Sequence, residues 1–185
     1  MTAVFLDRDG VIIRKAPQGE YIRSWSEVQF LPGAIKALVS LYQAGLKIIV
    51  VTNQRGVALG RVTRESLEDI HAHLQAELLQ SGVSIAEIYC CTHDLSAHCA
   101  CRKPRPGMLL SAAQTHRLNL QNCWMVGDAL SDVEAGKRAG CKTIMIRQDA
   151  GSWATALEPD FVVTDLSEGA HFILRLSNSK ADSYV

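Results

Sequence analysis

The sequence predicts an α/β fold in which a doubly wound, mostly parallel β-sheet is flanked by helices. Short apolar runs, typical of buried strands, alternate with longer segments whose apolar residues recur at helical spacing. Strands joined through helices pair in parallel, which places helices on both faces of the sheet. The 185 residues, of which 48% are hydrophobic, are enough for one domain with a substantial core.

Six strands and four helices account for most of the chain. The strands are expected at residues 4–6, 47–51, 87–90, 123–126, 143–146 and 161–163. The helices are expected at residues 33–43, 63–80, 107–117 and 131–139. The polar residues 177–185 are expected to form a flexible tail, which leaves residues 1–176 as a single domain.

Composition and charge argue against several classes of protein. Lys and Arg together number 19, as do Asp and Glu, so the net charge is zero, whereas nucleic-acid-binding proteins usually carry a basic excess. No apolar run approaches the roughly 20 residues of a membrane helix, and the N-terminus lacks the pattern of a secretion signal. We therefore expect a cytoplasmic protein, monomeric by default. Its six cysteines are then expected to be thiols or metal ligands rather than disulfides.

Polar residues cluster where the predicted strands end, which is where ligands bind in doubly wound sheets. The segments are Asp7-Arg8-Asp9-Gly10, Thr52-Asn53-Gln54, Arg102-Lys103-Pro104 and Gly127-Asp128, with Asp132 following the last. Of two carboxylates two residues apart, one can attack phosphorus while the other transfers a proton. A lysine and a hydroxyl can hold phosphoryl oxygens, and carboxylate and carbonyl oxygens are the ligands that Mg²⁺ prefers. The set predicts phosphoryl transfer.

The four segments, in this order, resemble the four motifs of the haloacid dehalogenase superfamily. A single Asp-x-Asp pair is common in proteins, so the ordered set carries the resemblance. It implies that Asp7 is the nucleophile, which forms an aspartyl-phosphate, and that Asp9 is the general acid and base. The second acid, two residues after the first, indicates a phosphatase rather than a dehalogenase.

The same resemblance implies roles for the remaining motif residues. Thr52 and Lys103 would hold the phosphoryl group. Catalytic Mg²⁺ would be bound by Asp7, the backbone carbonyl of Asp9 and Asp128, with Asp132 in support. The connections between the motifs are too short for a large cap domain, so the site is expected to be open.

Cys91, His93, Cys99 and Cys101 form a second constellation, with five residues between the two pairs. Three sulfurs and one imidazole can close a tetrahedron around Zn²⁺ and leave no position for water, which is typical of a structural site. The zinc would order the loop that leads into Lys103. The other cysteines and the histidines are not expected to take part: Cys123 and Cys141 are expected in the core, and His71, His73 and His116 are expected to face solvent.

The zinc loop narrows the resemblance to the branch of the superfamily that acts on heptose bisphosphates or on histidinol phosphate. Residues 52–60 and 101–110 favour the heptose bisphosphates. This implies a small phosphorylated sugar as substrate, a sugar pocket lined by Tyr21, Asn53, Gln54 and Arg55, and recognition of the sugar or second phosphate by Arg102. A guanidinium suits the last role because it binds phosphate in a fork.

Two departures from the heptose pattern keep the alternatives open. The short gap between the zinc pairs is closer to the histidinol-phosphate members, and Ala129 stands where the heptose enzymes often have lysine. Polynucleotide 3′-phosphatases share the first two motifs, but the zero net charge disfavours them. A binding module on a retired phosphatase fold is a further alternative, which the retained Asp7, Asp9, Lys103 and Asp128 disfavour.

Overall fold

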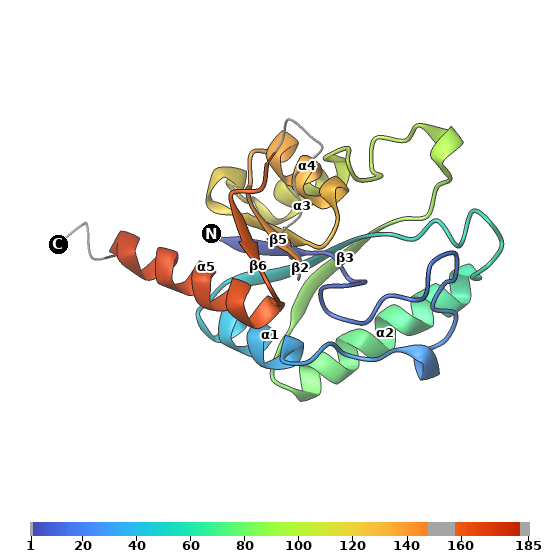
Figure 1. Ribbon diagram of the computed structural model, residues 1–185, viewed down its shortest axis with the longest axis horizontal. Coiled ribbons are helices and arrows are strands. Elements are labelled where there is room, and N and C mark those ends of the chain that lie inside the picture. Colours follow the sequence, from blue (N-terminus) through green and yellow to red (C-terminus); the bar gives the residue numbers. More distant parts are fainter. Residues whose placement is uncertain (1, 148–157, 182–185) are drawn as a thin grey trace.

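The computed structural model describes residues 2–147 and 158–181 and has the predicted α/β architecture (Figure 1). Six parallel strands form one sheet in the order β3-β2-β1-β4-β5-β6. β1 and β4 lie side by side at its centre, and the chain winds outward from them in both directions. The prediction of a doubly wound parallel sheet is therefore confirmed.

Every expected strand is present. The strands are β1 Ala3–Leu6, β2 Lys47–Asn53, β3 Ile85–Cys91, β4 Trp124–Gly127, β5 Lys142–Ile146 and β6 Phe161–Val163. β2 extends beyond its apolar run because Thr52 and Asn53 continue the ladder opposite Cys90 and Cys91. The strand thus carries its polar residues to the edge of the sheet, where the predicted site lies.

The helices are α1 Ala34–Gln43, α2 Arg64–Gln80, α3 Gly107–His116, α4 Leu130–Ala139 and α5 Leu166–Ala181, and the short 3₁₀ helices are η1 Trp25–Glu27, η2 Leu95–Ala97 and η3 Leu120–Asn122. The hydroxyl of Thr63 caps α2 by accepting a hydrogen bond from Ser66 N. α5 was not among the expected helices, and it continues past Ser177, where we expected the tail to begin. Residues 182–185 of that tail lie outside the described residues.

The helices form two layers, one on each face of the sheet (Figure 1). Alternate residues of β1 point to opposite faces, so Val4 and Leu6 pack with α1, α2 and α5, while Ala3 and Phe5 pack with α3 and α4. The same alternation in β2 and β4 buries both faces. A sheet covered on both sides leaves its carboxyl edge as the place for a ligand.

The connections at this edge are loops rather than a second domain. Residues 7–33, between β1 and α1, contain only η1 and two isolated bridges made by Ile13. Residues 92–106, between β3 and α3, contain η2 and the predicted zinc loop. Across residues 2–147 and 158–181 the fold has no large cap, as expected. Within the part of the chain that the structure describes, no helix has the length and apolar character needed to cross a membrane.

Candidate active site and metal clusters

Asp7 is the first residue after β1, and its backbone N–H extends the ladder to β4 by donating to Val126 O at 3.0 Å. Its side chain is 13% exposed. Asp7 Oδ1 accepts a hydrogen bond from the backbone N–H of Arg8 at 2.8 Å and lies 3.0 Å from Lys103 Nζ. These contacts fix the carboxylate at the centre of the sheet's carboxyl edge.

Lys103 lies under this carboxylate with its side chain 1% exposed. Its ammonium donates to Val51 O at 2.7 Å, and its nitrogen lies 3.0 Å from Asp7 Oδ1 and 2.6 Å from Asp132 Oδ1. Burial alone would lower the pKa of Lys103, but the charges of Asp7 and Asp132 outweigh burial and raise it. Burial has the opposite effect on a carboxyl group: it raises the pKa of Asp132, although the charge of Lys103 opposes this shift. The site therefore holds a fixed cation beside Asp7.

Asn53 holds the backbone of Lys103 in place. Asn53 Nδ2 donates to Lys103 O at 3.0 Å, and Asn53 Oδ1 accepts from Lys103 N at 3.1 Å. Asn53 was expected in the sugar pocket, and this further contact was not predicted because the two residues are 50 positions apart in the chain. The amide connects the end of β2 to the loop that delivers the lysine.

Asp9, the second acid of the first motif, accepts hydrogen bonds from Arg8 and from Gln54. Arg8 Nε donates to Asp9 Oδ2 at 3.2 Å, and Arg8 Nη2 donates to Asp9 Oδ1 at 3.0 Å. Gln54 Nε2 donates both to Asp9 Oδ2, at 2.7 Å, and to Thr52 Oγ1, at 2.8 Å. A hydroxyl can accept and donate at once, so Thr52 keeps its own O–H for a ligand. Gln54 thus connects the first two motifs.

Asp7, Asp128 and Asp132 each place one carboxylate oxygen within 4.8 Å of the others. Asp128 Oδ1 is buried and has no hydrogen-bond partner, while Asp128 Oδ2 lies 2.6 Å from Lys15 Nζ. Burial raises the pKa of Asp128, although Lys15 opposes the shift. A buried oxygen without a partner, among hard oxygen donors, fits a divalent cation such as Mg²⁺.

Gly10 leaves room for the carboxylate of Asp128 in the acidic cluster. Its φ of +90° belongs to the left-handed region, and a Cβ there would lie 1.9 Å from Asp128 Oδ2. Asp132, by contrast, is already engaged, since Asp132 Oδ2 accepts from Ala129 N at 3.0 Å and Asp132 Oδ1 contacts Lys103. The supporting role of Asp132 stays a prediction, for which these two contacts supply a physical basis.

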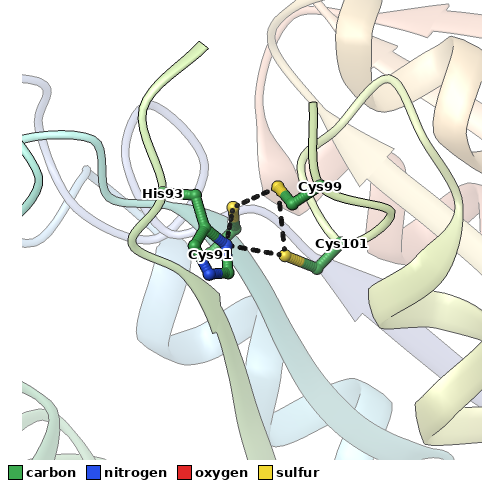
Figure 2. Close-up of side chains that lie close together, drawn as sticks. All are labelled: Cys91, His93, Cys99 and Cys101. Atoms are coloured by element: carbon green, nitrogen blue, oxygen red, sulfur yellow. Dashed lines mark hydrogen bonds between the residues drawn. The ribbon is translucent and has the colours of Figure 1, made fainter. Parts of the chain in front are cut away.

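Figure 2 shows that Cys91, His93, Cys99 and Cys101 point toward one another, from the end of β3 and from the loop before α3. The sulfur of Cys99 lies 3.6 Å from that of Cys91 and 3.4 Å from that of Cys101. His93 Nδ1 lies 3.6 Å from the sulfur of Cys91 and 3.2 Å from that of Cys101. Sulfurs bound to one tetrahedral zinc at about 2.3 Å are about 3.8 Å apart, so the four side chains fit Zn²⁺.

Four of the five predicted substrate-binding residues line one of two cavities. Tyr21, Asn53 and Gln54 line a cavity of ≈ 250 Å³ together with Asp9. Arg102 lines a second cavity of ≈ 300 Å³, and its Nη1 is buried without a hydrogen-bond partner. Arg55 lies apart from both cavities' linings and pairs with Asp94 at 2.5 Å.

Two histidines that were expected to face solvent are partly buried, so that expectation is wrong for them. His71 Nε2 lies 3.1 Å from Arg8 Nη1, and His116 Nε2 lies 3.0 Å from Glu87 Oε2. Both contacts join residues far apart in sequence, which helical spacing alone does not reveal. His73 is exposed, as expected, and stacks on Trp25.

Comparisons with known proteins agree with this geometry. A family model described as HAD-hydrolase-like matches residues 100–169. The chain is 36% identical, over 82% of its own length and 85% of the relative's, to the D-glycero-beta-D-manno-heptose-1,7-bisphosphate 7-phosphatase of Pseudomonas putida. The chain belongs to the haloacid dehalogenase (HAD) superfamily. It is a HAD phosphatase, a hydrolase of phosphoric monoesters.

Other relatives of this HAD phosphatase carry closely related names. The D-glycero-alpha-D-manno-heptose-1,7-bisphosphate 7-phosphatase of Mycobacterium bovis is 40% identical over 77% of this chain and 78% of its own length. The crystal structure of D,D-heptose 1,7-bisphosphate phosphatase from B. bronchiseptica, complexed with magnesium and phosphate, superposes with a TM-score of 0.85 at 31% identity, covering 95% of this chain and 99% of that one. The predicted fold, superfamily and enzyme class are confirmed.

Proposed function

We propose that this HAD phosphatase removes the 7-phosphate of D-glycero-D-manno-heptose 1,7-bisphosphate. The identity of 36–40% to phosphatases named for this substrate, over about four-fifths of the chain, carries the proposal. The open carboxyl edge of the sheet, with three carboxylates beside Lys103 and no large cap on the described residues, suits a small phosphorylated sugar. The relatives include enzymes named for the α and for the β anomer, so both anomers belong in the test.

In the first step, Asp7 attacks the phosphorus and the bond from phosphorus to the sugar oxygen breaks. Asp9 donates its proton to that oxygen, which leaves as an alcohol. Lys103 is close enough to Asp7 to neutralise charge on the transferred phosphoryl group, and Thr52 can donate its O–H. The product of this step is an aspartyl-phosphate on Asp7.

In the second step, a water molecule attacks the phosphorus and transfers a proton to Asp9. Inorganic phosphate leaves and the carboxylate of Asp7 is restored. Asp7, Asp128 and the backbone carbonyl of Asp9 are the groups that would hold Mg²⁺, which would supply positive charge to the phosphoryl oxygens. Asp132 supports the site by fixing Lys103.

Substrate positioning is assigned to the two cavities beside the catalytic edge. Tyr21, Asn53 and Gln54 border the cavity next to Asp9, which supports a role for them beside the sugar. The buried, unpartnered nitrogen of Arg102 suits an anionic group of the substrate. Arg55 is the weakest member of the proposed set, because Asp94 already neutralises it.

Cys91, His93, Cys99 and Cys101 are assigned to a structural Zn²⁺. The site offers four protein ligands and so leaves no open position for a substrate or water. Its role would be to hold the loop that carries Arg102 and Lys103. Zinc would therefore stabilise the fold, whereas magnesium would take part in the reaction.

The test is phosphate release in Mg²⁺ from a panel of substrates. The panel contains both anomers of the heptose 1,7-bisphosphate, histidinol phosphate and a 3′-phosphorylated oligonucleotide. We expect kcat/KM for one heptose anomer to exceed that for the other substrates by at least about a hundredfold, since a built site discriminates by several kcal/mol. A preference for histidinol phosphate would show that the short zinc loop is the better guide to the substrate, and the heptose assignment would be abandoned.

A further inference from the structure

Arg8 has no part in the chemistry described so far, although it lies between the two catalytic aspartates and is 1% exposed. Burying a guanidinium is costly unless each of its nitrogens finds a partner. Here Nε and Nη2 donate to Asp9, and Nη1 contacts His71 of α2. A buried cation whose printed side-chain contacts go to a catalytic residue and to one helix calls for an explanation.

We infer that Arg8 and His71 are positioning residues, which hold the carboxylate of Asp9 in its orientation for proton transfer. The inference rests on the proposed role of Asp9 as general acid and base. It assigns Arg8 and His71 no contact with substrate. They act through Asp9.

The geometry of the guanidinium fixes Asp9 at two points. Arg8 Nε lies 3.2 Å from Asp9 Oδ2, and Nη2 lies 3.0 Å from Asp9 Oδ1. A planar fork that engages both oxygens restrains rotation of the carboxylate, which a single contact would allow. Gln54 Nε2 adds a third hydrogen bond, at 2.7 Å to Oδ2.

His71 in turn restrains Arg8. Arginine offers only donors, so Nη1 needs an acceptor, and His71 Nε2 lies 3.1 Å from it. Burial, and to a lesser extent the charge of Arg8, lowers the pKa of His71 to about 4, so the ring is neutral and Nε2 can accept. The ring is mounted on a helix anchored in the core by Leu67, Ile70 and Leu74. The chain of contacts therefore runs from a rigid helix to the catalytic carboxylate.

The rival explanation is that the contacts serve stability alone. The two explanations differ in which substrates they affect. An alkyl phosphate releases a basic alkoxide that needs the proton of Asp9, whereas p-nitrophenyl phosphate releases a weakly basic phenolate that does not. Misplacing Asp9 therefore penalises the alkyl substrate selectively, but general damage to the fold penalises both alike.

The experiment compares His71→Leu, which removes the acceptor, with His71→Gln, which keeps one. kcat/KM is measured in Mg²⁺ for p-nitrophenyl phosphate and for the simple alkyl phosphate that wild type hydrolyses fastest. This ratio covers the steps up to formation of the aspartyl-phosphate, so later steps do not mask the effect. We expect His71→Leu to lose about tenfold or more on the alkyl phosphate and less than about threefold on p-nitrophenyl phosphate, with His71→Gln restoring most of the loss.

Two further variants keep the test decisive. His73→Leu makes the same change two residues along α2 at an exposed position, and we expect it to match wild type on both substrates. Arg8→Lys keeps a cation but cannot engage both oxygens of Asp9, and we expect the same selective loss if His71→Leu does not fold. Equal losses on the two substrates, or none, in the folded His71 and Arg8 variants would overturn the inference. Neither substrate is a heptose bisphosphate, so a wrong sugar assignment would leave this result unaffected.

Discussion

At the scale of single residues, Lys103 connects the chemistry of the site to its stability. Its ammonium lies among three acceptors, one of which, Asp132, is 1% exposed. Removing one partner of a buried ion pair leaves the other charge uncompensated, and that usually costs more than the pair contributed. The lysine proposed to hold the phosphoryl group is therefore also the counterion of the two carboxylates beside it.

We expect Lys103→Met to lower the free energy of unfolding by about 3–5 kcal/mol and to abolish turnover. Adding Asp132→Asn removes the orphaned charge, so the double variant should lose less stability than the sum of the two single changes. Urea unfolding of the four proteins measures the coupling. Strict additivity would mean that Lys103 and Asp132 do not interact in the way that their 2.6 Å separation indicates.

A substitution of Asp7, the proposed nucleophile, tests the chemistry with little effect on folding. Asp7→Asn keeps an oxygen that can accept from Arg8 N, and Lys103 retains Val51 O and Asp132 as partners. We expect kcat to fall at least about a thousandfold while the melting temperature changes little. Asp165→Asn, at an exposed position, is the control in the same phosphate-release assay. Turnover within about tenfold of wild type would assign the nucleophile to another residue.

Which residues meet at the site followed from the sequence, but several of their contacts did not. The motif residues could be predicted from the sequence because they stand directly after predicted strands, and the carboxyl ends of parallel strands lie at one edge of the sheet. Asn53 was expected to bind sugar, yet its amide holds the backbone of Lys103. His71 was expected to face solvent, yet it contacts Arg8 from 63 positions away. Such pairings depend on how α2 and the zinc loop pack, which residue spacing does not encode.

At the scale of elements, the loop between β3 and α3 is held from several directions. The cluster of Cys91, His93, Cys99 and Cys101 joins the end of β3 to the middle of the loop. In addition, Arg105 Nη1 donates to Cys99 O at 2.9 Å, and Gly107 N donates to Ala100 O at 3.1 Å. A loop of this length has little apolar surface to bury, so its order depends on such specific contacts. The loop carries Lys103 and ends at the start of α3.

We expect removal of zinc by a chelator to destabilise the protein by about 3 kcal/mol, which is about 6–12 °C in Tm for a domain of this size. Hydrogen exchange should rise between Cys99 and Gly107 and should recover when zinc is added back. Cys99→Ser should reproduce the effect without chelator. Cys90→Ala, outside the cluster, should not. An unchanged Tm after verified zinc removal would refute the structural role.

The connection between β5 and β6 contains a carboxylate whose ionisation stabilises the fold. Asp160 Oδ2 accepts from Thr143 N at 2.7 Å and from Thr143 Oγ1 at 2.9 Å, and Asp160 Oδ1 pairs with Lys137 of α4. Burial alone would raise the pKa of Asp160, but these partners hold it below its usual value. A carboxyl whose pKa falls on folding stabilises the protein above its unfolded pKa, and loses that contribution as the pH falls through the folded one.

We therefore expect Asp160→Asn to lower the free energy of unfolding by about 1 kcal/mol at pH 7. The difference from wild type should shrink as the pH falls below about 4, where the wild-type carboxyl becomes protonated. Urea unfolding at several pH values measures both quantities. Glu68→Gln, at an exposed position of α2, is the control. A difference that grows in acid would mean that Asp160 stabilises the fold in its protonated form.

The elements themselves were predictable to within a few residues, because their apolar spacing is strong. The exceptions have causes that lie outside the local sequence. β2 was expected to end at Val51 but continues through Thr52 and Asn53, since ladder pairing with β3 outweighs the polarity of these residues. α5 was missed because its C-terminal part is polar, although Leu166, Ala170 and Ile173 bury one of its faces. Burial against a sheet is a tertiary effect that a polar sequence conceals.

At the scale of the whole molecule, one sheet separates two hydrophobic clusters. Leu41 of α1 belongs to one cluster and Leu109 of α3 to the other, and both residues are fully buried. The clusters share β1, β2 and β4, whose alternate residues contribute to each side. Neither helical layer can bury its apolar face without the sheet, so the two clusters should form and melt together.

We expect a single cooperative unfolding transition, as predicted for one domain over residues 1–176. Leu41→Ala and Leu109→Ala should each cost about 2–5 kcal/mol and should shift that one transition as a whole. The test follows urea unfolding by far-UV circular dichroism and by the fluorescence of Trp124, which is 2% exposed in β4, with Trp25 and Trp153 replaced by Phe. Coincident curves in both leucine variants support one cooperative unit. If Leu109→Ala melted α3 and α4 while Trp124 remained buried, the two faces would be independent units, and loss of zinc could then loosen the Lys103 loop without unfolding the rest.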